Sequence, residues 1–384
     1  MRGNPFGASR ALWRAARRRM FGERGDIVNR DRTRSGRSMA ARISKPKVRR
    51  TPWDRFDDEQ LLDLRFCDLA LEWEGTSLET HVQQVWNELA LRDIRIRPHI
   101  WLSTEWFSPD GIPGVAVPFY LAHPRLLRLE KTMMLEAEGG TREDCLGILR
   151  HEFGHCVQHA WRLHRRSEWR RQFGNTHKPY PEIYRPNPAS QRFVQHLRQY
   201  YAQAHPDEDF AETFAVWLTP RSAWRRRYAG WPALRKLEYV DELMRELRGV
   251  PAQIKSRKRV EPLSQVRRTL REHYVEKQAH YARWRPTVQD RDLQRLFAAE
   301  PGRRGEQATR FVRRNRGEIR RMVSRFTGES PFTLERVLDD VMSRCQVLDL
   351  KASGNERRLR VDVALLLTVR TVHFHYSRKN WIAL

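Results

Sequence analysis

The sequence has few cysteines, and no two of them lie close together. Its four cysteines, Cys67, Cys145, Cys156 and Cys345, show no CxxC spacing, which excludes the usual cysteine pattern of zinc and dithiol sites. A chain of 384 residues with so few cysteines is also unlike a small disulfide-rich secreted domain. We therefore expect reduced cysteines in the core of a cytoplasmic protein.

Long apolar runs are also absent. No run reaches the roughly 20 apolar residues needed to span a bilayer, and the apolar stretch 361–369 is too short. No apolar stretch follows the basic first residues, so these residues do not resemble a secretory signal. We expect no membrane partner.

Acidic residues are scarce relative to basic ones. The chain has 73 Lys and Arg against 47 Asp and Glu, for a net charge of +26. Residues 1–50 hold 16 basic and 3 acidic residues, or +13, and residues 286–384 hold 20 and 12, or +8. The section between them therefore carries only +5. The charge permits nonspecific nucleic-acid contact through the basic flanks, but no RRM, KH or zinc-finger pattern indicates specific readout.

Residues 1–50 have few periodic apolar positions, so we expect a basic, disordered extension. This extension has some transit-peptide character, and Met39 is an alternative start. The length predicts two further parts: a domain over residues 51–285 and a basic C-terminal region over 286–384.

The most informative segment is His151-Glu152-Phe153-Gly154-His155, an HExxH motif. Residues i and i+4 of a helix share a face, so His151 and His155 can bind one metal ion while Glu152 reaches a water on it. Zinc lowers the pKa of such a water to about 7, which makes it a nucleophile at neutral pH. Two imidazoles and a carboxylate on a buried helix need partners, and a metal supplies them.

The residues around the motif predict a long, largely buried helix of about 22 residues. Thr141 and Asp144 resemble a capping box at its start, directly after Gly139 and Gly140. Apolar residues recur with a period close to 3.6: Leu146, Leu149, Phe153, Cys156, Val157 and Ala160.

The third metal ligand is not the histidine of the metzincins. That position is occupied by Trp161, and Gln158 stands where metzincins have glycine. His159 follows His155 by only one further turn, which is an awkward ligand geometry, and His164 lies too far along the helix.

A second motif, residues 205–215 (HPDEDFAETFA), offers better ligands. Pro206 and the acidic residues after it favour the start of a helix, and Pro220 ends it. Glu208 and Glu212 share one face, so one can bind zinc while the other hydrogen-bonds a ligand imidazole. A solvated acidic turn would not explain Glu212, which stands among apolar residues.

HEFGH followed by EDFAETFA resembles the gluzincin metallopeptidases (HExxH…ExxxE). The second motif resembles the HP-x-EDWAETWA segment of a bacterial zinc-binding metallopeptidase group, and the anthrax lethal factor catalytic domain is similar too. The resemblance covers residues 99–220. It implies a Zn²⁺ cofactor, Glu208 as the third ligand, Glu212 behind a ligand histidine, and a protein or peptide substrate. It also implies that Tyr201, seven residues before Glu208, donates to the oxyanion, with the adjacent Tyr200 as the alternative.

The expected fold class is α+β, with a zincin-like metallopeptidase domain and a mostly helical C-terminal region. Helices are expected near 58–73 and 78–91, the latter with Thr76 and Glu79 as a capping box. A small mixed sheet should follow, with strands near 94–102, 114–122 and 126–129 and an exposed edge that could align a peptide. Residues 175–188 could form a lid, a substrate wall or a plain connector. Residues 361–369 alternate like a strand, although a buried helix is also possible.

Three functions are considered: a zinc endopeptidase with Glu152 as general base, a basic nucleic-acid-associated protein, and a protease recruited to nucleic acid or ribosomes by its flanks. An inactive zinc protein is disfavoured because Glu152 has no ligand role. Zinc content distinguishes the first function from the second.

Overall fold

The computed structural model describes residues 51–181, 183–184, 186–283, 285–297, 305–376 and 382–383. The expected disordered extension, residues 1–50, lies outside this part of the chain. The helices are α2 (Asp58–Leu62), α3 (Ser77–Ala90), α4 (Pro124–Met134), α5 (Arg142–Ala160), α6 (Ser167–Phe173), α7 (Pro206–Leu218), α8 (Trp224–Arg227), α9 (Ala233–Glu246), α10 (Leu270–Arg283), α11 (Asp290–Leu296), α12 (Ala308–Thr327), α13 (Pro331–Val347) and α14 (Glu356–Tyr376).

Strands are short and few in the described residues, which gives a mostly helical protein of the α+β class. The strands are β1 (His99–Ser103), β2 (Gly114–Pro118), β3 (Ile183–Tyr184), β4 (Glu306–Gln307), β5 (Lys351–Ala352) and β6 (Ile382–Ala383). Single turns of 3₁₀-helix occur at η1 (Pro52–Arg55), η2 (Phe66–Asp68), η3 (Phe119–Ala122), η4 (Leu163–Arg165), η5 (Arg198–Gln203) and η6 (Leu263–Gln265).

The principal sheet consists of β1 and β2, which pair in parallel with His99 opposite Gly114. A side chain at Gly114 would place its Cβ 2.3 Å from the His99 ring, so this position requires glycine. Every residue of both strands is buried, and Phe107 pairs with Ala116 on β2. The exposed strand edge that the sequence suggested is therefore not present here.

The third expected strand, residues 126–129, is wrong, because these residues lie in α4. Pro124 occupies the first turn of α4, and the His123 side chain accepts a hydrogen bond from the Arg125 amide as its N-cap. These two features begin a helix whatever the β propensity of the leucines that follow.

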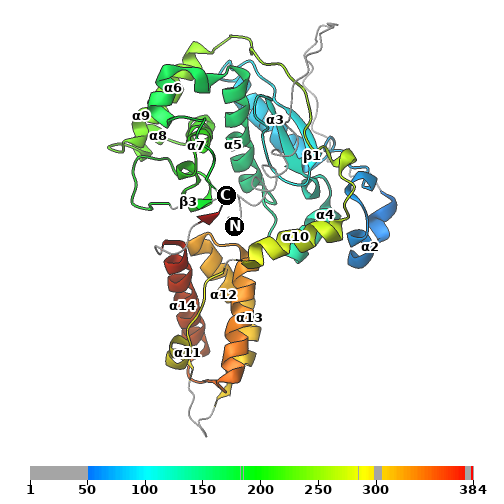
Figure 1. Cartoon of the computed structure of the whole chain (residues 1–384), viewed down its shortest axis with the longest axis vertical. Coiled ribbons are helices and arrows are strands. Elements are labelled where there is room, and N and C mark those ends of the chain that lie inside the picture. The colour runs from blue at the N-terminus through cyan, green and yellow to red at the C-terminus, as the bar shows by residue number, and fades with distance from the viewer. Residues whose placement is uncertain are drawn as a thin grey trace.

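The N-terminal part of the described chain, from Trp53 to Tyr274, shares one hydrophobic core. Helix α5 runs through it and packs against α3 on one side and α7 on the other (Figure 1). Arg150 of α5 donates two hydrogen bonds, of 2.8 and 2.7 Å, to the buried Glu88 carboxylate of α3. This bidentate pair fixes how far α5 is rotated about its axis.

Helices α11 to α14 form a second core, from Leu293 to Leu367, and project from the rest of the chain (Figure 1). The sequence left open whether the apolar stretch 361–369 is a strand or a buried helix. It lies in α14 and is therefore helical. Val363 and Leu367 face the second core, whereas Val361 and Leu365 are exposed. Helix α10 lies beside both groups and packs against α13.

Of the two helices expected before the sheet, one is confirmed. Helix α3 begins after Thr76, whose hydroxyl accepts from the Leu78 amide, while the Glu79 carboxylate accepts from the Gly75 amide. Thr76 therefore caps α3, but Glu79 does not complete a capping box. The helix expected over 58–73 ends at Leu62 and gives way to turns. No described helix is long and apolar enough to cross a membrane.

Candidate metal centre

The HExxH motif lies in the second half of α5. The Thr141 hydroxyl accepts a hydrogen bond from the Asp144 amide and starts the helix, as the sequence predicted. The helix spans 19 residues and ends before Trp161, close to the expected length. Residues 148–160 are all buried, so little of the motif is exposed to solvent.

The second motif forms α7, which crosses α5 at very short range. A Cβ on Gly154 would lie 2.9 Å from Cα of Ala211, closer than real Cβ contacts. The glycine of HEFGH and the first alanine of EDFAETFA are therefore the point where the two helix backbones touch. This contact brings the carboxylates of α7 to the histidines of α5.

Three donor atoms from the two motifs form a small, buried triangle. The Glu208 Oε2 atom lies 3.1 Å from Nε2 of His151 and 3.3 Å from Nε2 of His155, and the two nitrogens are 3.2 Å apart. Three ligands at 2.0–2.1 Å from one tetrahedral ion would be about 3.4 Å apart. The three side chains are the one group in the described residues with the donors and spacing to hold a metal ion.

A second carboxylate orients the first histidine. Glu212 is fully buried, and its Oε1 atom lies 2.8 Å from Nδ1 of His151. Its other oxygen accepts a 2.9 Å hydrogen bond from the Leu197 amide. A proton on Nδ1 leaves Nε2 as a lone pair that points toward His155 and Glu208, which is the arrangement a metal ligand needs.

The electrostatics of this group favour a cation. Burial alone would lower the pKa of His151, but its hydrogen bonds to Glu208 and Glu212 outweigh burial and raise the pKa to about 9. In other words, the two carboxylates stabilise positive charge at the imidazole. A metal ion placed among the three donors would satisfy the same demand without protonating a ligand.

Tyr180 contacts the candidate ligand Glu208 from the connector between the helices. Its hydroxyl donates a 2.8 Å hydrogen bond to Oε1 of Glu208, the oxygen that faces away from the histidines. Its ring stacks on His205 with 3.6 Å between centroids. His205 in turn accepts the Asp207 amide as the N-cap of α7. Tyr180 therefore fixes Glu208 so that only Oε2 faces the histidines.

Of the two candidate tyrosines, Tyr201 lies at the histidines. It is 2% exposed, and its ring centroid is 5.6 Å from that of His151. Tyr200 is half-buried and, like Gln199, has a left-handed backbone (φ 57° and 59°). These two left-handed residues directly precede Tyr201, whose ring contacts His151.

Glu152 is buried beside the two histidines on α5, at 2% exposure. The hydroxyl of Ser108, from the loop between β1 and β2, donates to the Glu152 carbonyl at 3.2 Å. His159 lies outside the triad, with its Nε2 atom 3.9 Å from the Asp110 carboxylate. This position agrees with the prediction that His159 is not a metal ligand.

The sequence analysis missed Tyr180, although it noted the loop 175–188 as a wall or a connector. The pattern of prolines and tyrosines in this loop indicates a structured segment but does not say which tyrosine contacts α7. It also missed the Leu197 amide, which has no sequence pattern at all because every residue has such a donor.

Comparison with known proteins supports a metal site over the same residues. A sequence model of a family described as "putative zinc-binding metallo-peptidase" matches residues 131–227, which include all of α5 and α7. No curated protein and no solved structure matches the chain. The zinc-binding family and the buried His–His–Glu group together identify zinc as the cofactor.

Proposed function

We propose that this protein is a zinc-dependent metallopeptidase that hydrolyses peptide bonds in proteins or peptides. The observation that carries the proposal is the buried triangle of His151, His155 and Glu208, backed by Glu212 on the first histidine. A merely structural zinc would be expected to have a fourth protein ligand. Three protein donors leave one position for water or substrate.

Zinc, when bound, supplies a Lewis acid that lowers the pKa of a water molecule and polarises a carbonyl. Glu152 is the carboxylate of the motif that is not needed as a ligand. It takes the proton of the attacking water and delivers it to the leaving amine. Its burial at 2% exposure keeps bulk water from competing for that proton.

Tyr201 is the proposed donor to the oxyanion of the tetrahedral intermediate. Support comes from its position beside the candidate ligand His151, with 5.6 Å between ring centroids. Tyr180 has a different role, because its hydroxyl already donates to Glu208. It positions a ligand.

The test combines metal analysis of the purified chain with cleavage of a peptide library. We expect one zinc per chain and peptide turnover in the wild type. Glu152→Gln should keep zinc and lose turnover by a factor of about 10² to 10⁴, because the amide cannot accept the proton. Glu208→Gln should lower zinc affinity itself, because a neutral oxygen replaces an anionic ligand.

Glu143→Gln is the matched control, since Glu143 is an exposed carboxylate in the first turn of the same helix. It should leave both zinc content and turnover unchanged. Undiminished turnover in Glu152→Gln, or equal zinc loss in Glu152→Gln and Glu208→Gln, would overturn the assignment of base and ligand. Full zinc occupancy with no cleavage of any peptide would overturn the activity.

A further inference from the structure

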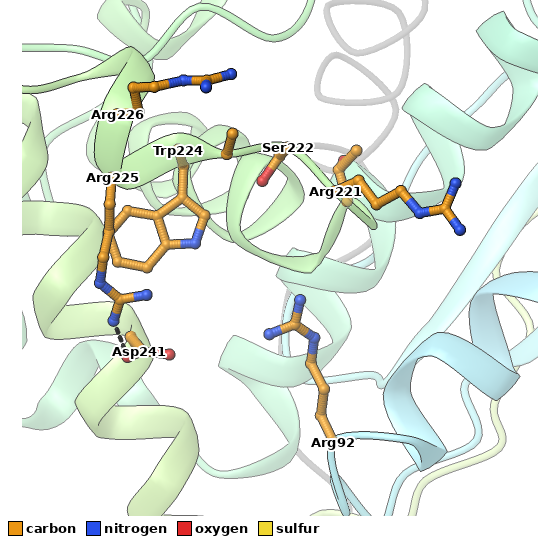
Figure 2. Close-up of a pocket in the computed structure, with 9 residues that line it drawn as sticks. Arg92, Arg221, Ser222, Trp224, Arg225, Arg226 and Asp241 are labelled. Atoms are coloured by element: carbon orange, nitrogen blue, oxygen red, sulfur yellow. Dashed lines mark hydrogen bonds and ion pairs between the residues drawn. The ribbon is translucent and has the colours of Figure 1, made fainter.

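A cavity of about 490 Å³ opens at the far end of α7 from the metal centre (Figure 2). It is lined by Arg92, Thr219, Arg221, Ser222, Ala223, Trp224, Arg225, Arg226 and Asp241. No residue of the His–His–Glu group belongs to this lining. Glu208 and Thr219 are separated by eleven residues of helix, so the cavity lies roughly 16 Å from the metal centre along the axis.

Hydrogen-bond donors converge on this cavity. Figure 2 shows the guanidinium of Arg92, the indole nitrogen of Trp224 and the hydroxyl of Ser222 turned toward the same open space. Most of the Trp224 ring is buried, but its N–H is not among the buried unpaired donors of the described residues and lies at the open side of the cavity. This N–H is therefore free to donate to a molecule that enters the cavity.

Arg92 is held in place by neutral partners. Its Nη2 donates to the carbonyls of Trp217 and Leu218 at 2.9 and 3.5 Å, and its guanidinium stacks over the Trp217 ring at 4.1 Å. In the described residues it forms no ion pair. Burial lowers the pKa of Arg92, and nearby Asp241 and Glu88 only partly offset this. A bound anion would compensate the charge that the protein leaves unpaired.

The carboxylate in the lining is already neutralised. Asp241 accepts from Arg225 at 2.7 Å, from Arg245 at 2.9 Å and from the Trp217 indole at 2.9 Å. Arg221 and Arg226 are exposed at the rim and form no ion pair within the described chain. The cavity therefore has an excess of positive charge.

The loop that brings these groups together has a strained backbone. Arg221 and Ala223 both adopt left-handed conformations, with φ of 56° and 47°, and neither is glycine. Such conformations are uncommon and cost on the order of 1 kcal/mol each. Ser222 and Trp224, the residues that follow them, are the two that direct donors into the cavity.

We infer that this cavity binds the phosphate group of a small phosphorylated molecule. A guanidinium, an indole N–H and a hydroxyl approach from three directions, which suits a tetrahedral oxyanion with several acceptor oxygens. A planar carboxylate has two oxygens in one plane and would leave a donor unused. The volume is large enough for the phosphate and a small organic group.

The test is calorimetric titration of the full, zinc-loaded chain with inorganic phosphate, adenosine monophosphate and acetate at about 0.15 M chloride. Phosphate and the monophosphate should bind with one site per chain, and acetate should bind at least about tenfold more weakly. The Glu208→Gln variant, titrated in the same way, should keep this binding, because the cavity does not include the metal centre. Loss of phosphate binding in that variant would show that phosphate binds the metal, and would overturn the inference.

Two pairs of variants locate the site. Trp224→Phe and Ser222→Ala each remove one donor without changing charge, and each should weaken phosphate binding by about tenfold. Arg226→Gln should weaken it further than Arg235→Gln, because Arg235 is an equally exposed arginine on α9 outside the cavity. Circular dichroism and melting temperature verify that each variant is folded.

The inference would also be overturned by a lack of binding of inorganic phosphate and the monophosphate, by equal binding of acetate, by equal effects of Arg226→Gln and Arg235→Gln, or by wild-type affinity in a folded Trp224→Phe variant. Binding of an oligonucleotide in the absence of phosphate and monophosphate binding would also overturn it, in favour of diffuse attraction to nucleic acid.

Discussion

The two cores of this protein differ in where they place charge. In the first core, the packed face between α5 and α7 contains two histidines and two glutamates that are at most 5% exposed. In the second core, most ion pairs lie at the surface, such as Arg344 with Asp290, both 44% exposed. Surface pairs contribute little to stability, whereas buried charge is costly unless something compensates it. Of the two cores, only the first contains, within the described residues, a buried group whose charge a metal ion could compensate.

Where the two parts meet, polar contacts link them. The Gln199 side chain of η5 donates to the Gly328 carbonyl at 3.5 Å, and Thr333 of α13 donates to the Tyr281 carbonyl at 3.4 Å. A buried pair, Glu329 with His375 at 2.6 Å, lies at this end of the C-terminal helices. The C-terminal part thus contacts the segment that carries Tyr201.

Removal of zinc should have the largest effect, and only on the first core. Zinc present at about 1,000 times its Kd stabilises a binding fold by about 4 kcal/mol, which corresponds to roughly 10 °C in melting temperature. Chelation should therefore lower the first calorimetric transition and speed amide hydrogen exchange in α5 and α7. Protection in α12 and α13 should be unchanged. An equal loss of protection in both parts would mean that they do not unfold separately.

Gly154→Ala and Gly317→Ala compare a close helix contact with an open one. The new Cβ at Gly154 would lie 2.9 Å from Cα of Ala211, so α5 and α7 must separate. We expect destabilisation of about 2 kcal/mol and weaker zinc binding. At Gly317 of α12 the nearest atom is Nη1 of Arg321, 3.8 Å away, so alanine should stabilise that helix by up to about 1 kcal/mol. Urea denaturation and zinc titration measure both, and a neutral Gly154→Ala would contradict the close contact.

Tyr180→Phe should affect metal binding more than folding. The phenol hydroxyl that fixes Oε1 of Glu208 is lost, while the ring can still stack on His205. Loss of a partner behind a ligand weakens zinc binding by about tenfold or more. Tyr200→Phe is the control, because Tyr200 is also half-buried, whereas the tyrosine that donates to Glu208 is Tyr180. Competition with a zinc chelator measures the zinc affinity of both variants. Equal zinc affinities would show that the Tyr180 hydroxyl does not support the metal ligand Glu208.

The substitution Glu136→Gln should have the smallest effect on stability. It tests the contact between the two cores, because Glu136 lies near Arg198 and Ser330. Burial raises its pKa to about 7, although Arg198 and Ser330 oppose the rise. The folded state therefore prefers the protonated acid, and stability is lost as pH increases from about 4.5 to 7. Glu136→Gln should melt a few degrees above the wild type at pH 8 and differ less at pH 5. The same difference at both pH values would show that this carboxyl does not titrate on unfolding.

Local patterns predicted the helices of the metal centre well. Thr141 and Pro206 begin α5 and α7 through contacts within four residues, so the sequence alone contains the information. The prediction of a third strand over 126–129 was wrong, because His123 and Pro124 begin a helix there despite the apolar residues that follow. The predicted helix over 58–73 was too long, since α2 ends at Leu62 and turns follow it.

Contacts across long sequence separations could not be predicted from the sequence. Tyr180 and Glu208 are 28 residues apart, and the path of the connector between α6 and α7 brings them together. The residues next to Tyr180 do not indicate that it, and not another tyrosine, makes this contact. The cavity of Figure 2 joins Arg92 to residues 219–241. Arg92 reaches this cavity only because α3 and α7 pack against the same helix, α5.

The direct backbone contact at Gly154 has a consequence for how such proteins can diverge. Helix α7 must keep Glu208, Ala211 and Glu212 in fixed register, because one inserted residue would turn Glu208 by about 100° away from the histidines. The connector from Gly174 to His205 has a looser requirement, because it must only bring Tyr180, Leu197 and Tyr201 to the site. We therefore expect distant relatives to keep two short motifs of fixed length, HExGH and ExxAE, and to vary in length in the parts of the connector that do not contact the site.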